Sequence, residues 1–251
     1  MKKVTLLCGL LLAMSATIAS ASGVGIRWTN CLSDGGLSNR NFACTSNTGA
    51  GVLLGTFQLD ADLPNTSGEE IVVDLASAQP TLPAWWGFVV AGTCRQGALQ
   101  LFAAPPASAV NCADWAQGLA TIGIGAYNIG ARGPNTARLV AAAAVPPASL
   151  QLLTPGQEYF SFNATISNTK SVGTGSCAGC SDPVCIVFNS LNLTTPILAN
   201  NVKLTGPSNG TDSHFVTFQG GAGIVTGGGT GCPAATPTKN ATWSQVKAMY
   251  H

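Results

Sequence analysis

Alternation of apolar and polar residues is clearest in two runs, EYFSFNATI at residues 158–166 and VCIVFNSLNL at residues 184–193. In both runs apolar side chains recur at nearly every second position, which is the period of a β-strand with one buried face. The intervening polar positions carry Ser, Thr and Asn instead of charged residues. The two runs therefore predict strands whose outer face meets water without charge.

Further strand-like runs, bounded by Gly, Pro, Asn and Ser, lie on both sides of these two. They cover 24–28, 51–60, 69–76, 86–91, 119–129, 137–145 and 213–219, and the two leading runs extend to 158–168 and 184–194. Within this region the sequence predicts helical structure only at 112–117, as a single turn. Strands separated by turn residues are typical of an antiparallel, jelly-roll-like β-sandwich and not of βαβ units. We therefore predict an all-β, disulfide-stabilised sandwich at 22–219 with one core.

Composition excludes several classes of protein. Only 8% of the 251 residues are charged, 46% are hydrophobic, the mean hydropathy is +0.29 and the net charge is +1. A disordered chain would have low hydropathy and high net charge, and a nucleic-acid-binding protein would carry a basic stripe. We expect no nucleic-acid partner. After the N-terminus no run of about 18 apolar residues follows, so we expect no transmembrane segment once the leader is removed.

The N-terminus has the pattern of a signal peptide. Lys2 and Lys3 precede an apolar run at 4–18, and Ala19-Ser20-Ala21 fits the small-x-small rule for cleavage, so residues 1–21 form the predicted leader. Its removal leaves nine basic and ten acidic residues and a net charge of −1. The protein is predicted to be secreted, either extracellular or at the cell surface.

Export to an oxidising compartment indicates that the cysteines form disulfides. Eight cysteines lie beyond the leader: Cys31, Cys44, Cys94, Cys112, Cys177, Cys180, Cys185 and Cys232. An even number in an oxidising compartment predicts up to four disulfides. Loop spacing favours the local pairs Cys31 with Cys44 and Cys94 with Cys112. The Cys177-x-x-Cys180 spacing leaves zinc binding and a redox pair as alternatives, and Cys232 is a candidate tether back to this cluster.

The organisation changes after Gln219. A Gly-, Pro- and Thr-rich linker is predicted at 220–238, followed by a short amphipathic helical tail at 239–251. A Thr-x-x-Gln capping box precedes an apolar stripe of Trp243, Val246 and Tyr250. Two roles are open for this stripe: docking on the domain, or recognition by a partner or an export and anchoring machine.

Three segments carry a resemblance to known proteins: NATWSQVKAMY at 240–250, LPAWWGF at 82–88 and CAGCSDPVC at 177–185. The first resembles a C-terminal tail, Thr-Trp-Gly-x-(Val/Ile)-Lys-x-x-Tyr followed by a basic residue, that recurs on exported β-rich proteins of environmental bacteria, and the other two resemble one such set. Ser244 and His251 depart from the usual tail pattern. The resemblance implies export and assigns no catalytic residues.

Catalytic motifs are weak, and we predict no catalytic residue. The run GPSNG at 206–210 matches Gly-x-Ser-x-Gly but lacks the preceding buried strand and following helix of a nucleophile elbow. Ser213 and His214 are neighbours in a predicted strand, so their side chains point to opposite faces. We therefore expect no Ser-His catalysis here.

Acidic residues concentrate at 60–74. Asp60, Asp62 and Asn65 are weak calcium candidates, although their spacing is not that of an EF-hand. The simpler interpretation is a solvated hairpin turn between the strands 51–60 and 69–76. A third alternative uses the carboxylates of this region in a polysaccharide-active hydrolase. We expect no cofactor, with calcium as the alternative.

Trp85 and Trp86 are the candidate ligand-binding residues. Adjacent side chains of an extended chain point to opposite faces, so one ring is expected at the surface, where aromatic rings often contact glycans or proteins. Alternatively, both rings pack beneath the loop that contains Cys94. We predict an exported, non-catalytic binding or assembly protein whose partners are a glycan, other surface proteins or itself. The alternatives are the hydrolase and a calcium-stabilised adhesive module.

Overall fold

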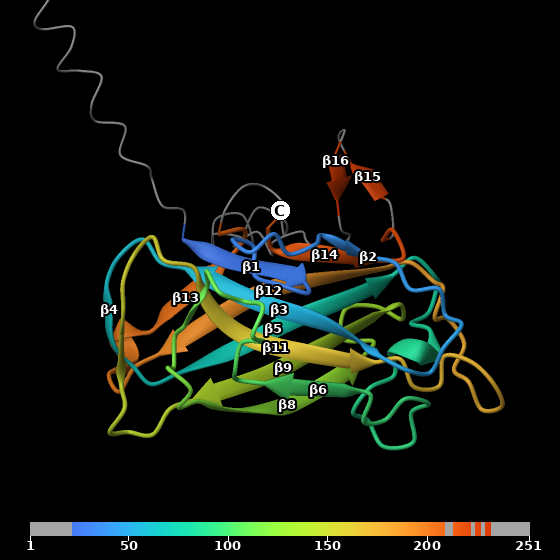
Figure 1. Ribbon diagram of the computed structural model, residues 1–251, viewed down its shortest axis with the longest axis horizontal. Helices are drawn as coiled ribbons and strands as arrows, with labels where there is room; N and C mark the ends of the chain where they lie inside the picture. Colours follow the sequence, from blue (N-terminus) through green and yellow to red (C-terminus); the bar gives the residue numbers. More distant parts are fainter. Residues whose placement is uncertain (1–21, 209–212, 222–223, 227–228, 232–251) are drawn as a thin grey trace, which may run out of the picture.

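The computed structural model describes residues 22–208, 213–221, 224–226 and 229–231. Strands form nearly all of its regular structure, and two antiparallel sheets face each other (Figure 1). The predicted all-β, jelly-roll-like sandwich with disulfides is confirmed. No described helix is long and apolar enough to cross a membrane.

The first sheet, which we call the β11 sheet, has the order β1-β3-β11-β6. Its strands are β1 (Gly23–Trp28), β3 (Ala50–Gln58), β11 (Tyr159–Ser167) and β6 (Leu99–Phe102), with the short β7 (Ala113–Asp114) parallel to the start of β11. Strand β11 has a bulge between Phe160 and Phe162 opposite Gly55. A Cβ at Gly55 would lie 2.1 Å from the Phe162 ring, so only glycine fits there.

The second sheet, the β12 sheet, has the order β2-β14-β12-β5-β9-β8. Its strands are β2 (Asn39–Arg40), β14 (Phe215–Phe218), β12 (Val184–Thr194), β5 (Gly68–Ser77), β9 (Thr136–Ala144) and β8 (Thr121–Ile129), and β13 (Val202–Thr205) also pairs with β12. Two small pairs complete the fold, β4 (Leu63–Thr66) with β10 (Gln151–Leu153), and β15 (Ile224–Thr226) with β16 (Gly229–Gly231). The 3-10 turns are η1 (Ala84–Trp86) and η2 (Leu198–Asn200).

The apolar core lies between the inward faces of the two sheets. Phe57 and Phe162 from the β11 sheet meet Val73 and Phe188 from the β12 sheet, and each of these side chains is at most 2% exposed. Phe162 and Phe188 contact each other edge to face, with ring centroids 5.3 Å apart. The alternating runs of β11 and β12 supply this contact, as their sequence pattern predicts.

Three expectations about local structure are wrong. The segment 86–91 is not a strand, because the 3-10 turn η1 and further turns occupy 84–93. The segment 112–117 contains β7 and a turn instead of a helical turn. The acidic segment after β3 is not a hairpin turn, because β3 and β5 belong to different sheets and β4 lies on the crossing between them.

The local disulfide pairing is also wrong. The bonds are Cys31–Cys112, Cys44–Cys180 and Cys94–Cys177, with sequence separations of 81, 136 and 83 residues. The antiparallel strands return the loops of Cys44, Cys94, Cys177 and Cys180 to the same end of the sandwich, whereas Cys31–Cys112 packs with Leu54 and Phe160 in a separate small cluster on the β11 sheet. Cys177 and Cys180 bond to different loops, so they form neither a zinc site nor a redox pair. Cys185 is disulfide-bonded as well, while Cys232, the linker beyond 231 and the tail helix lie outside the described residues.

Glu69 is a carboxyl group inside the core. The side chain is 2% exposed, its Oε2 accepts a hydrogen bond of 2.9 Å from the Ser161 hydroxyl, and its Oε1 has no hydrogen-bond partner among the described residues. Burial raises the pKa of Glu69 from 4.5 to about 8, against the opposing effect of hydrogen bonds from Ser161 and Trp115. The folded protein therefore binds a proton here that the unfolded chain releases near pH 4.5.

We predict that this proton makes stability depend on pH. Between pH 4.5 and about 8 the folded state holds the proton and the unfolded state does not, so stability falls as the pH rises through this window. The slope reaches about 1.4 kcal/mol per pH unit. Urea unfolding at several pH values should show this loss in the wild type and its disappearance in Glu69→Gln. The matched control Glu70→Gln, at the exposed neighbouring position, should keep the slope, and equal slopes in the two variants would contradict the assignment.

Candidate functional site

Trp85 and Trp86 lie in η1, at the right-hand end of the sandwich in Figure 1. Pro83 precedes this turn with φ −60°. Successive side chains of a 3-10 turn are rotated by about 120°, not 180° as in a strand, and both rings turn inward, with 1% and 0% exposure. The expectation of one ring at the surface is therefore wrong and the alternative, that both rings pack inside, is confirmed. Neither indole presents an open face to a glycan.

The two rings form an aromatic cluster with residues from other elements. Trp85 stacks on Phe218 of β14 at 5.2 Å, and Trp86 meets the same ring edge-on at 5.1 Å. Phe88 lies 5.8 Å from Trp86, and the hydroxyl of Tyr127 in β8 donates a hydrogen bond of 2.7 Å to the Trp86 carbonyl. Burial raises the pKa of Tyr127, which keeps this hydroxyl a donor. The cluster thus joins the η1 loop to β14 and β8 of the β12 sheet.

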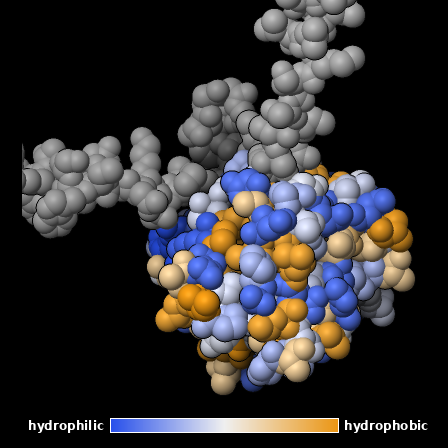
Figure 2. All heavy atoms as spheres, turned by 90° about the vertical axis from the view of Figure 1, so that its left-hand side faces the viewer, coloured by the Kyte–Doolittle hydropathy of each residue, from blue (hydrophilic) through white to orange (hydrophobic). Residues whose placement is uncertain are grey.

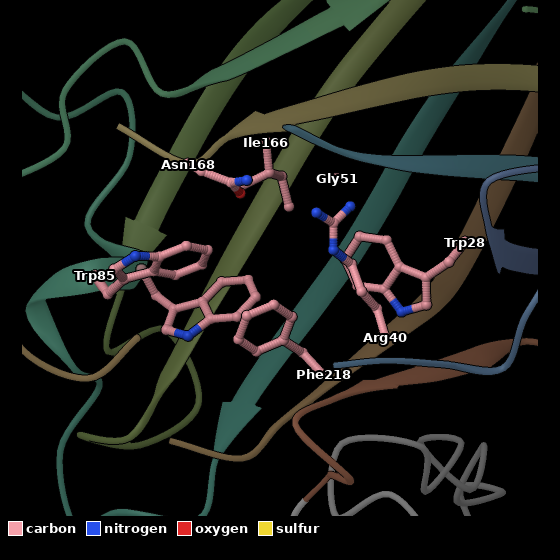
Figure 3. Close-up of a pocket in the computed structure, with 8 residues that line it drawn as sticks. Trp28, Arg40, Gly51, Trp85, Ile166, Asn168 and Phe218 are labelled. Carbon is pink, nitrogen blue, oxygen red and sulfur yellow. The ribbon is translucent and has the colours of Figure 1, made fainter. Parts of the chain in front are cut away.

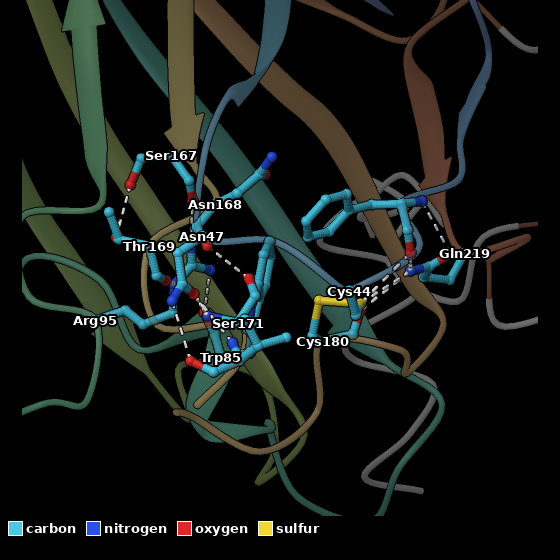
Figure 4. Close-up of a disulfide and its surroundings, with 12 residues drawn as sticks. Cys44, Asn47, Trp85, Arg95, Ser167, Asn168, Thr169, Ser171, Cys180 and Gln219 are labelled. Carbon is cyan, nitrogen blue, oxygen red and sulfur yellow. Dashed lines mark hydrogen bonds between the residues drawn. A yellow bond between two sulfur atoms is a disulfide. The ribbon is translucent and has the colours of Figure 1, made fainter. Parts of the chain in front are cut away.

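Arg95 covers this cluster with a buried guanidinium. Its Cζ lies 3.6 Å from the centroid of the Trp85 ring, and the residue is 1% exposed. Nη1 donates to the Trp85 carbonyl at 2.7 Å, Nε to the Thr169 carbonyl at 3.0 Å, and Nη2 to the Ser167 carbonyl (Figure 4). Burial lowers the pKa of Arg95 to about 10, so the group is charged at neutral pH. Backbone carbonyls and an aromatic ring, not a carboxylate, make these contacts with the charge.

Covalent and polar links fix the surrounding loops. The Cys94–Cys177 bond joins the η1 loop to the 168–183 loop. The Cys44–Cys180 bond, drawn in Figure 4, joins the 41–49 loop to the same segment. The Asn47 side chain accepts hydrogen bonds from the backbone N–H groups of Ser171 and Val172 at 2.8 and 3.0 Å. Three loops at this end of the sandwich are therefore held as one unit.

A small aromatic cleft lies beside this unit. Its lining comprises Trp28, Arg40, Gly51, Trp85, Trp86, Ile166, Asn168 and Phe218 (Figure 3). The Arg40 guanidinium lies 5.7 Å from the Trp28 ring centroid and donates to the Ala50 carbonyl at 2.9 Å. A Cβ at Gly51 would lie 2.4 Å from Arg40 Nη1, so glycine leaves room for the guanidinium. The cavity volume of about 10 Å³ holds roughly one water molecule and is far too small for a sugar ring.

The calcium candidates Asp60, Asp62 and Asn65 lie on the crossing from β3 to β5. All three side chains are exposed, and Asn65 has a left-handed backbone with φ 58°. Calcium binding there stays a prediction. Among the described residues, the ligand-type side chains that do gather are Cys31, Asp34 and Cys112, and the two cysteines are bonded to each other.

The remaining acids of the 60–74 region lie in separate environments. Glu69 points into the core, whereas Glu70, the next residue of β5, is exposed on the opposite face. Asp74 is buried on the outer face of the β12 sheet, where Arg138 donates at 2.7 and 2.8 Å and Arg132 at 3.0 Å. Burial opposes its ionisation, but hydrogen bonds from Arg138 and Asn189 lower the pKa of Asp74 below its usual value. The Asp74 carboxylate is paired with Arg132 and Arg138, and the Glu69 and Glu70 side chains lie on opposite faces of β5.

An open strand edge is the other prominent feature. Strand β8 ends the β12 sheet and pairs only with β9 among the described strands. Its sequence, TIGIGAYNI, has no charged residue and no proline. The exposed apolar residues Leu119 and Ile129 lie just before β8 and at its end, with 46% and 45% exposure. In the β11 sheet, β6 is likewise an edge strand, it contacts β8, and its Phe102 is 44% exposed.

The end of the sandwich that holds β4 and β13 differs in character. Figure 2 shows hydrophobic and hydrophilic residues interspersed over this face. Scattered apolar residues are common on soluble proteins and do not mark a site. Leu152, Ile197 and Leu198 at this end are more exposed than Leu119 and Ile129. The β8 edge is the stronger candidate for an interaction surface because it adds a row of backbone groups that no other described strand pairs with.

Comparisons with known proteins show similarity to two solved cohesin modules. No protein-family model and no curated protein matches the chain. A solved cohesin module from a family 33 glycoside hydrolase of Clostridium perfringens is similar at 6% identity with a TM-score of 0.34, covering 79% of this chain and 93% of that one. The second type II cohesin module from the ScaA scaffoldin of Acetivibrio cellulolyticus is similar at 10% identity with a TM-score of 0.29, covering 70% and 85%. At these values neither module's function transfers to this chain.

We predict that Arg95→Met destabilises the protein strongly. The change removes the donor to three carbonyls, one buried and two partly buried. Each costs about 1–3 kcal/mol when it is left unsatisfied, so the total loss should be at least about 3 kcal/mol. The matched control is Arg40→Met, which removes one carbonyl contact and a longer cation–π contact and should cost about 1 kcal/mol. Guanidinium chloride unfolding of both variants, with disulfides intact, measures the difference. Equal losses would contradict the role given to Arg95.

Proposed function

We propose that the protein is an exported, non-catalytic assembly module in which the β8 edge of one copy pairs with the β8 edge of a second copy. The predicted leader and the disulfides support an extracellular or cell-surface location, since disulfides persist in oxidising compartments. The proposed general role is still binding, but we place the binding surface at the β8 edge instead of at Trp85 and Trp86.

The observation that carries the proposal is the nine-residue edge strand β8. The free side of such a strand presents unpaired N–H and C=O groups that can pair with another strand. Natural proteins usually protect long edges with charged residues or proline, and β8 has neither. A register shift between Ile124 and Ala126 is the one irregularity along its pairing with β9.

A second copy is the partner that the chemistry of this edge favours. Because β8 has no charged residue, a β8 strand from another copy can pair with it without burying an unpaired charge. The small predicted net charge of −1 also gives little electrostatic repulsion between two copies. Antiparallel pairing of β8 with β8 about a two-fold axis makes the same contacts on both sides. With the axis at Gly125, Ile129 of each copy would lie opposite Thr121 of the other, close to its Leu119.

We predict that Gly123→Lys weakens self-association. A Cβ at Gly123 would meet no atom within 4 Å, and the residue is exposed and has no positive φ, so the fold should tolerate lysine there. A charge on the edge should raise the dissociation constant at least about tenfold, or 1.4 kcal/mol. The control is Ser108→Lys, at an exposed turn position between β6 and β7, which should behave as wild type. Light scattering after size exclusion measures the mass, and a wild type that stays monomeric at all concentrations would overturn the proposal.

A further inference from the structure

We propose that Cys185 is bonded to Cys232, and that this bond holds the C-terminal segment 233–251 against the outer face of β12 and β14. The proposal concerns a different part of the β12 sheet from the β8 edge and does not depend on self-association.

The cysteines themselves define the bond. The sequence contains nine cysteines, six of which form the three disulfides among described residues. Cys185 is disulfide-bonded too, and the cysteines left for it are Cys8 and Cys232. Cys8 belongs to the predicted leader. Cys232 is then the partner that an exported chain retains.

The surroundings of Cys185 indicate a cover over the sheet. Val184, Ile186 and Phe188 of β12 belong to the core, so the intervening Cys185 and Val187 point to the outer face. These two residues are nevertheless only 1% and 2% exposed, and with Phe215 of β14 they form an apolar cluster separate from the main core. On the outer face Asp74 and Phe215 lie beside Val187, but the residues paired with Cys185 are the short Ala76 and Thr217. These two side chains are too small to cover the Cys185 sulfur, so its cover has to come from above the outer face.

The tail beyond Cys232 has the right chemistry and length for this cover. Its predicted apolar stripe of Trp243, Val246 and Tyr250 suits an apolar patch. The ten residues between Cys232 and Trp243 can span up to about 33 Å, whereas neighbouring strands are about 4.8 Å apart. A segment anchored at Cys185 therefore reaches every part of the Cys185, Val187 and Phe215 cluster. Strands β5 and β9 separate this cluster from β8.

The bond is tested by peptide mapping of the exported, non-reduced and alkylated chain. Cleavage before Asp182 and Asp212 and after Lys203 and Lys239 produces two peptides, 182–203 and 212–239, each with a single cysteine. We expect these two peptides to be joined and to separate on reduction. Recovery of either peptide alkylated by itself, or joined to a different one, would overturn the pairing.

The cover is tested separately by the rate at which the Cys185–Cys232 bond is reduced in the folded, exported chain. A soluble thiol reductant is added for increasing times and quenched with a maleimide, and the fraction of separated 182–203 and 212–239 peptides gives a rate that reports how often the patch is uncovered. Trp243→Ser should raise this rate at least about tenfold, while Lys247→Ser, on the polar side of the predicted tail helix, should leave it unchanged. Equal rates in the two variants would show that the tail does not cover the patch.

Discussion

The guanidinium of Arg95, buried against the Trp85 ring, links loops at one end of the sandwich that the strand pairing within the two sheets does not join. Its donors reach carbonyls of the η1 turn, of the last residue of β11 and of the segment that follows β11, and Cys94 beside it is bonded to Cys177. A buried cation is costly unless its donors are satisfied, so these loops must keep their positions for the charge to be tolerated. The disulfides reduce the conformational entropy of the unfolded chain, and the hydrogen bonds of Arg95 fix the positions of the loops in the folded protein.

This end contrasts with the long side of the sandwich formed by β6 and β8. At the η1 end, the aromatic rings that the sequence suggested for ligand binding pack inside the protein, and Trp85 and Trp86 are almost wholly buried. At β8, by contrast, one side of the strand has no partner strand in the described structure, and apolar Leu119 and Ile129 are partly exposed. Rigidity at one place and an unprotected edge at another are compatible with a module that stays folded while it associates.

The sequence pattern predicted the central strands well and the connections poorly. The bounds Val184–Thr194 of β12 agree with the alternating run, because burial of one face imposes period two on the residues. Strands β4, β6 and β10 have three or four residues each, too few for a period to appear. The expectation that one of the two tryptophan rings is exposed failed because it assumed an extended chain where a 3-10 turn exists. The disulfide pairing failed because proximity in sequence says little about which loops the antiparallel strands bring together.

Self-association through β8 is tested most directly by hydrogen exchange of its backbone amides at increasing protein concentration. Amides of β8 that do not pair with β9 face the free edge and should exchange quickly in a dilute monomer. We expect these amides to become protected as the protein concentration rises, while amides in the 103–110 loop do not change. Exchange in β8 that is independent of concentration, or protection that develops at another strand, would contradict this expectation.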